Sequence, residues 1–145
     1  MIYYRLLRVT QLEYSVQTNM DVTDGGMVDL GLALGYQREQ SQVFLDVAAS
    51  YRSKDTNHRF LQFKARFLYA LQDFNSVITI DNGLTADSNF LVQIIQTSID
   101  TSRGILIARN AGTPLADIYI PVIQAEDLLQ HLRLIPEQTA DSDAK

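Results

Sequence analysis

The chain has 145 residues, of which 46% are hydrophobic and 20% are charged, and its net charge is −5. A chain of this length and composition is expected to fold as one domain around a core of its own. The acidity argues against a nucleic-acid binder. No apolar stretch approaches the roughly 18 residues of a membrane-spanning helix, and the absence of cysteine excludes disulfides and thiolate catalysis.

Four segments in the first half of the chain alternate apolar and polar residues, as strands with one buried face do. They span residues 4–16, 28–36, 43–51 and 61–71. The first is interrupted near Leu7-Arg8-Val9, where we expect a β-bulge that switches the faces. Short polar turns join the last three segments, and 18–27 forms a longer connection. The pattern predicts an antiparallel meander of four strands.

One of these strands has a nearly bare face. Between residues 28 and 36 the even positions are bulky, whereas the odd positions include Gly31, Ala33 and Gly35. Such small residues permit close approach by a backbone or by large side chains of neighbouring strands. The same face is also the place where a small-ligand carrier would have its pocket.

After Ile80 the spacing of apolar residues changes from the two-residue period of a strand to that of a helix. Asp87 or Ser88 can cap this helix, and apolar residues follow at helical spacing as far as Leu106. They cover an arc of roughly 200°, which is wider than one sheet needs and favours contact with a second subunit. Burial in a single deep core is the alternative. The residues predicted for the subunit interface are Phe90, Ile94, Ile95, Ser98 and Ile99.

An apolar segment connects this helix to a second one. Ser102-Arg103-Gly104 marks the end or a bend of the long helix, and residues 105–120 can form a loop, a hairpin or a helix extension. A short helix is expected from Ala125 to Leu132, and Pro136 stops it. We therefore predict one domain over 1–135, followed by a polar, disordered tail over 136–145. The fold class is α+β, with both helices packed on one face of the meander.

Few residues suggest chemistry. His58 and His131 have no partner at metal-binding spacing, so a solvated surface position is the simpler interpretation. Asp29 and Asp46 lie in apolar strands, where a carboxylate pair can do acid/base work, but a cross-strand partner satisfies each more simply. We expect no enzymatic activity, no metal and no cofactor.

The order of elements resembles the SecB-like family of bacterial protein-export chaperones. The resemblance rests on a helix leading into Ser102-Arg103-Gly104, then an apolar connection, Pro121-Val122, and a short helix containing Asp127-Leu128-Leu129. It implies a four-stranded antiparallel sheet with helices on one face, and dimers that assemble into tetramers through the long helices. It also implies grooves that hold unfolded polypeptide.

The resulting hypothesis is an ATP-independent chaperone for non-native polypeptides. Its contacts would be apolar side chains in the first crossover, the helix connection and the short helix: Met20, Val22, Met27, Ile105, Leu106, Ile107, Leu115, Ile118, Tyr119, Ile120, Leu128 and Leu132. The alternative is a SecB-like subunit dedicated to one partner, such as a toxin–antitoxin chaperone or an assembly factor. A small-ligand carrier is the third and most remote hypothesis.

The expected setting follows from the same observations. The N-terminal stretch has no signal-peptide pattern, so a cytoplasmic protein is expected. The expected partners are non-native polypeptides and further copies of this chain, arranged as a dimer of dimers. Neither nucleic acid nor membrane insertion is expected.

Overall fold

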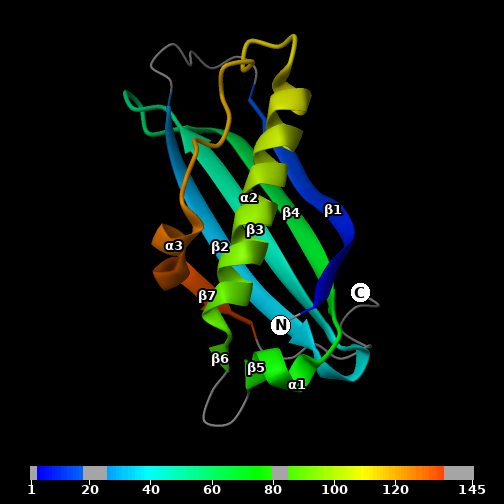
Figure 1. The fold of residues 1–145 in the computed structure, drawn as a ribbon. Coiled ribbons are helices and arrows are strands. Elements are labelled where there is room, and N and C mark those ends of the chain that lie inside the picture. The colour runs from blue at the N-terminus through cyan, green and yellow to red at the C-terminus, as the bar shows by residue number, and fades with distance from the viewer. Residues whose placement is uncertain (1–2, 18–25, 80–84, 136–145) are drawn as a thin grey trace.

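The computed structural model describes residues 3–17, 26–79 and 85–135. It has the α+β fold class expected from the sequence, with one long helix, α2 (Ser88–Asn110), lying across one face of a five-stranded sheet (Figure 1). The strands of this sheet are β1 (Tyr4–Val16), β2 (Met27–Gln37), β3 (Gln42–Arg52), β4 (Arg59–Leu71) and β7 (Leu132–Leu134).

The strand order corrects the predicted meander. The sheet runs β1-β4-β3-β2-β7, so β1 pairs with β4 rather than with its neighbour in sequence, β2. The strands β2, β3 and β4 are consecutive and antiparallel, whereas β1 and β2 lie on opposite sides of the β4–β3 pair. The hairpin-connected strands β2, β3 and β4, with β1 beside β4, form a Greek key. The period-two pattern identifies strands but carries no information on which strands pair.

Strand β1 contains the predicted bulge and a second one. Its register against β4 shifts between Leu6 and Arg8, and again between Gln11 and Glu13. Each shift leaves one extra residue on β1, Leu7 in the first case and Leu12 in the second. A bulge re-aims the extra side chain and twists the strand.

The short C-terminal helix ends earlier than expected. The structure has α3 (Ala125–Leu128), then a 3₁₀ turn at Leu129–His131, and then β7, which pairs in parallel with β2. Leu132, predicted at the end of the helix, therefore starts a strand opposite Leu32. Leucines three and four apart fit a helix, but a free edge on β2 competes for the same residues.

A small hairpin leads into the long helix. Its strands are β5 (Ile78–Thr79) and β6 (Thr85–Ala86), which are antiparallel, and the short helix α1 (Phe74–Val77) precedes them. Asp87 follows as the N-cap, and its Oδ1 accepts a hydrogen bond of 3.0 Å from the backbone N–H of Phe90. The predicted start of α2 is confirmed. The helix continues past Gly104 to Asn110, so Ser102-Arg103-Gly104 is not its end, and the helix extension that the sequence left open is found over residues 105–110.

The core lies between α2 and the sheet, and it contains the residues predicted to bind a second subunit. The five side chains are at most 1% exposed within the single chain. Ser98 is buried with them because its hydroxyl lies 2.7 Å from the Tyr69 hydroxyl of β4. In this conformation a partner chain cannot touch these side chains: Phe90, Ile94, Ile95, Ser98 and Ile99.

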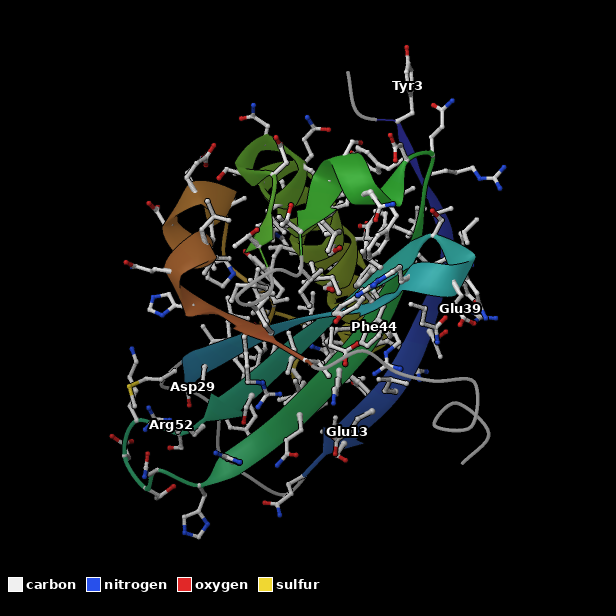
Figure 2. All side chains as sticks on the ribbon, turned by 90° about the horizontal axis from the view of Figure 1, so that it is seen from below. Tyr3, Glu13, Asp29, Glu39, Phe44 and Arg52 are labelled. Atoms are coloured by element: carbon white, nitrogen blue, oxygen red, sulfur yellow. The ribbon has the colours of Figure 1, made fainter. Side chains whose placement is uncertain are left out.

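The face of the sheet away from α2, here called the open face, is covered by no described helix (Figure 2). Phe44 lies on this face and yet is only 2% exposed. Its ring lies over Gly35, where an added Cβ would be 2.0 Å from the ring tip, and the Arg66 guanidinium lies 4.1 Å from the ring centre on the other side. The bare face of β2 therefore receives a large neighbouring side chain, as its glycines predict.

We expect the substitution Gly35→Ala to lower the free energy of unfolding by about 2 kcal/mol, because the new methyl group forces the Phe44 ring out of place. Gly104→Ala is the matched control. An added Cβ at Gly104 meets no atom within 4 Å, so this substitution should raise stability by up to about 1 kcal/mol through helix propensity. Urea denaturation of both variants measures the difference. Equal effects would contradict the packing described for Gly35.

Candidate polypeptide-binding surface

Residues 105–120, the apolar connection predicted from the sequence, are part helix and part loop and do not form a hairpin. Residues 105–110 continue the helix, and residues 111–124, here called the strap, run back alongside α2 towards α3 (Figure 1). The reversal begins at Gly112, whose φ of 75° suits glycine. The Asn110 carbonyl accepts hydrogen bonds from the N–H and the hydroxyl of Thr113, at 3.1 and 2.7 Å.

Three polar side chains of α2 fasten the strap. Asn110 Nδ2 donates to the Ile118 carbonyl at 2.8 Å, and Arg103 Nε donates to the Ile120 carbonyl at 3.1 Å. Gln96 donates to the Ile123 carbonyl at 3.4 Å and accepts from the N–H of Ala125 at 3.1 Å. The donors are seven residues apart, so they share one face of the helix. They satisfy backbone groups that no strand pairing serves.

The strap places three of its apolar side chains in the core. Leu115, Ile118 and Ile120 are 4%, 6% and 0% exposed, and Leu106 of α2 is 0% exposed. These four residues were predicted to bind polypeptide, and in this structure they are buried within the chain. Their burial also explains the wide apolar arc of α2, because the strap covers from within the same chain the part of the helix that the sheet does not reach.

The remaining apolar residues near the C-terminal end of α2 face outwards. Ile107 and Tyr119, both predicted for polypeptide binding, are each 46% exposed, and Ile105 is half-buried. Ile107 lies between the helix positions that bind the Ile118 and Ile120 carbonyls, so it shares this end of the molecule with Tyr119. Ile107 and Tyr119 are thus exposed at the same end of the molecule, whereas Ile105 lies on another side of the helix.

A hollow of about 260 Å³ opens at this same end, between the last residues of β1 and the start of the strap. Its lining is largely apolar: Tyr14, Val16, Gln17, Arg109, Thr113, Pro114 and Leu115. Tyr14 is held in place from two sides, because its hydroxyl donates to Asn110 Oδ1 at 2.6 Å and the Arg109 guanidinium lies 4.9 Å from its ring centre.

Among the residues that line this hollow, only Leu115 was predicted from the sequence. Tyr14 and Val16 belong to β1 and meet the strap only in the folded chain, so no local pattern joins them to Pro114. The polar positions Gln96, Arg103 and Asn110 were visible in the sequence as a seven-residue repeat on an otherwise apolar helix. That repeat was the available signal that a segment of backbone lies beside the helix.

The other predicted contacts are scattered. Met27 is 36% exposed at the start of β2, whereas Leu128 and Leu132 are half-buried and pack against the core. Met20 and Val22 lie outside the described residues. None of the three described residues of this group lines the hollow.

Strand β1 is the edge of the sheet next to this end. Only β4 pairs with it, so the N–H and C=O groups on its outer side have no strand partner among the described residues. Such an edge can accept an extended polypeptide as an additional strand. At its C-terminal end, from Tyr14 to Val16, this edge leads directly into the apolar hollow.

The two strand carboxylates have arginine partners. Asp46 binds Arg66, opposite it on β4, through two hydrogen bonds of 2.8 and 3.0 Å, and Asp29 lies 2.9 Å from Arg52 Nε. The hydrogen bond from Arg52 holds the pKa of Asp29 below its ordinary value. The interpretation of these aspartates as satisfied by strand partners is confirmed.

The buried phenols remain neutral. Burial raises the pKa of Tyr69 to about 12, against the smaller opposing effect of its hydrogen bond to Ser98, and burial raises the pKa of Tyr51 as well. No group of three or more His, Asp or Glu side chains that could hold a metal ion occurs within residues 3–17, 26–79 and 85–135. Across the same residues, no helix is both long and apolar enough to cross a bilayer.

No protein-family model matches the sequence, and no curated protein matches it. Among solved structures, the chain is similar to a SecB-like chaperone of Mycobacterium tuberculosis that was solved in complex with a peptide from an antitoxin. The two chains are 14% identical, and their superposition has a TM-score of 0.43. The match covers 85% of this chain and 90% of the other.

We expect Asn110→Ala to loosen the strap, because it removes hydrogen bonds to the Ile118 carbonyl and the Tyr14 hydroxyl. The unfolding free energy should fall by about 1–3 kcal/mol, the cost of leaving buried polar groups unpaired. Amide exchange over residues 115–120 should be faster. Thr97→Ala, at an exposed position of the same helix, is the control and should change stability by less than about 0.5 kcal/mol. Unchanged exchange in the Asn110 variant would contradict the fastening.

Proposed function

We propose that this protein is an ATP-independent chaperone that holds extended, non-native polypeptide at the apolar end of α2. The observation that carries the proposal is the hollow between β1 and the strap, with Ile107 and Tyr119 exposed at the same end. The resemblance of the element order to the SecB-like family implies the same function. In this proposal the protein binds and releases its clients without catalysing a reaction.

The geometry suggests how a client would be held. A segment lying beside Tyr14–Val16 can exchange backbone hydrogen bonds with the free edge of β1 while one apolar side chain enters the hollow. Complete burial of such a side chain contributes about 1.5–3 kcal/mol. The ordering of the client opposes this gain, so a single site binds weakly. Weak contact made mainly through backbone and one apolar anchor suits clients of varied sequence.

A homo-oligomer would overcome the weakness of a single site. We propose that several copies assemble, as a dimer of dimers, in the cytoplasm, so that one client can engage more than one hollow. The interface would lie on surfaces other than the sheet-facing side of α2, since that side is filled by the chain's own core. Participation in protein export is the corresponding biological role.

The second candidate function is binding of a single dedicated partner protein, as toxin–antitoxin chaperones or assembly factors do. The burial of Leu115, Ile118 and Ile120 favours it, because the remaining apolar surface is small and has a definite shape. A general chaperone would be expected to expose a larger apolar surface. Affinity purification from the native cell distinguishes the two, since a dedicated subunit retains one stoichiometric partner and a general chaperone retains many proteins in small amounts.

The hollow can be tested with two prolines of the strap, both of which are exposed. We expect Pro114→Asp to reduce the suppression of aggregation of a chemically unfolded client several-fold, because it places a carboxylate in the lining of the hollow. Pro121→Asp makes the same chemical change on the strap outside the hollow and should suppress aggregation as well as the original chain does. Light scattering at a fixed client concentration is the measurement.

The outcome is decisive in either direction. If the original chain fails to suppress aggregation at a stoichiometric amount, the general chaperone function is wrong. Equal loss in both proline variants, with unchanged denaturation midpoints, would move the binding site away from the hollow. The mass of the assembly from light scattering tests the oligomer separately, and a monomer at all concentrations would remove the dimer of dimers.

A further inference from the structure

The open face of the sheet carries positive charge in an acidic protein. Residues that pair across strands share one face, so the register places Arg5 and Arg8 of β1 on the open face, beside Ala70 and Leu68 of β4. The same argument places Lys64 of β4 there. The whole chain has a net charge of −5, so this distribution runs against its average.

A fourth cation reaches the open face from the opposite edge. Arg133 of β7 pairs with Ala33 of β2, and the two residues line a second hollow of about 310 Å³ together with Lys64. His131 lies at the rim of this hollow. Cations thus occur from β1 at one edge of the sheet to β7 at the other.

Among residues 3–17, 26–79 and 85–135, these four cations have no ion-pair partner. Asp46 and Asp29, two carboxylates of this face, are occupied by Arg66 and Arg52. No described side chain forms an ion pair or a hydrogen bond with the side chain of Arg5, Arg8, Lys64 or Arg133. Glu13 remains as the one unpaired strand carboxylate of the face, opposite Lys64 in register. In the described part of this face, four cations therefore stand against one carboxylate, which lies opposite one of them.

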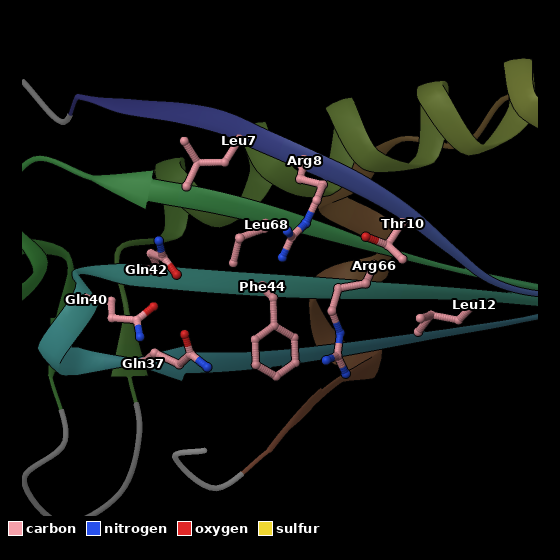
Figure 3. Close-up of a pocket in the computed structure, with 10 residues that line it drawn as sticks. All are labelled: Leu7, Arg8, Thr10, Leu12, Gln37, Gln40, Gln42, Phe44, Arg66 and Leu68. Carbon is pink, nitrogen blue, oxygen red and sulfur yellow. The ribbon is translucent and has the colours of Figure 1, made fainter. Parts of the chain in front are cut away.

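The cations surround an apolar floor. A hollow of about 570 Å³ on the open face is lined by Leu7 and Leu12, the two extra residues that the bulges of β1 create, and by Phe44 and Leu68 (Figure 3). Arg8 reaches over it from β1. The amide side chains of three glutamines close one end: Gln37, Gln40 and Gln42.

We propose that the open face is a docking surface for an acidic, extended segment of a partner polypeptide. Its carboxylates would pair with Arg8, Lys64 and Arg133, and its apolar side chains would rest on Leu7, Leu12 and Leu68. Neighbouring strands are about 4.8 Å apart, so the distance across the sheet from β1 to β7 is about 19 Å. Roughly six residues of an extended segment span this distance. This surface is separate from the hollow beside α2 and does not depend on the function proposed for that hollow.

The chemistry of the face favours a polypeptide over a nucleic acid. Single-stranded nucleic acids are held by bases stacked on exposed aromatic rings. Phe44, the aromatic side chain in the lining of this hollow, is 2% exposed and covered by Arg66. The glutamine amides can hydrogen-bond with peptide groups, and the net negative charge of the whole protein repels a long polyanion.

The test uses the full chain and a fluorescent peptide of about ten residues in which glutamate alternates with leucine. Fluorescence anisotropy measures its binding at low salt. We expect the combined substitution Arg8→Gln, Lys64→Gln and Arg133→Gln to weaken binding about tenfold, from three partly exposed ion pairs. The control is Lys54→Gln, which removes an exposed cation from the turn between β3 and β4. It should leave the affinity within about twofold.

Further arms separate the proposal from its competitors. The same peptide with glutamine in place of glutamate should bind at least about tenfold more weakly, and added salt should weaken only the glutamate peptide. The triple variant should still suppress client aggregation, which separates this surface from the hollow beside α2.

Four results would overturn the inference. They are equal binding of the two peptides, an unchanged affinity in the triple variant, tighter binding of a labelled single-stranded oligonucleotide than of the acidic peptide, and self-association through this face. The last would appear as a fall in molecular mass of the triple variant in light scattering. Each is measured with the same purified proteins, whose denaturation midpoints are compared first.

Discussion

The whole arrangement depends on how one helix covers its apolar surface. The apolar residues of α2 occupy more of its circumference than a single sheet can bury, and the helix is one of few elements on that side of the protein. The sheet takes Phe90, Ile94 and Ile95, and the strap takes the flank near Leu106. Since the chain itself provides both covers, the helix needs no partner to be stable.

The second cover is stabilised by polar contacts as much as by apolar ones. A strap that forms no ladder leaves its carbonyls without partners, and buried carbonyls without partners are costly. Gln96, Arg103 and Asn110 supply donors at intervals of seven residues, which is two turns of the helix. Apolar side chains can therefore alternate along the strap, with Ile118 and Ile120 inside and Tyr119 outside. The exposed side chains then face the solvent from a fixed backbone.

The sequence predicted the parts of the fold that short-range patterns determine. Alternation located β1 to β4, a capping residue located the start of α2, and small residues on β2 indicated a close approach that Phe44 makes. Prediction from the sequence failed where the structure depends on contacts between segments that are distant in the chain. The pairing of β1 with β4, and the change of Leu132 from helix to strand, depend on edges that exist only in the assembled sheet. Gly104 suggested a helix end, yet its position is exposed and tolerates a glycine.

The two bulges of β1 also limit how copies of the chain can add to one another through this edge. A straight edge strand of 13 residues with leucines on its surface would be a template to which further chains add without limit. The bulges divide β1 into regular stretches at Tyr4–Leu6, Arg8–Gln11 and Glu13–Val16, none longer than four residues. An incoming strand can therefore match only a short stretch before its register is lost. The irregularity that shapes the open face also limits the growth of fibrils.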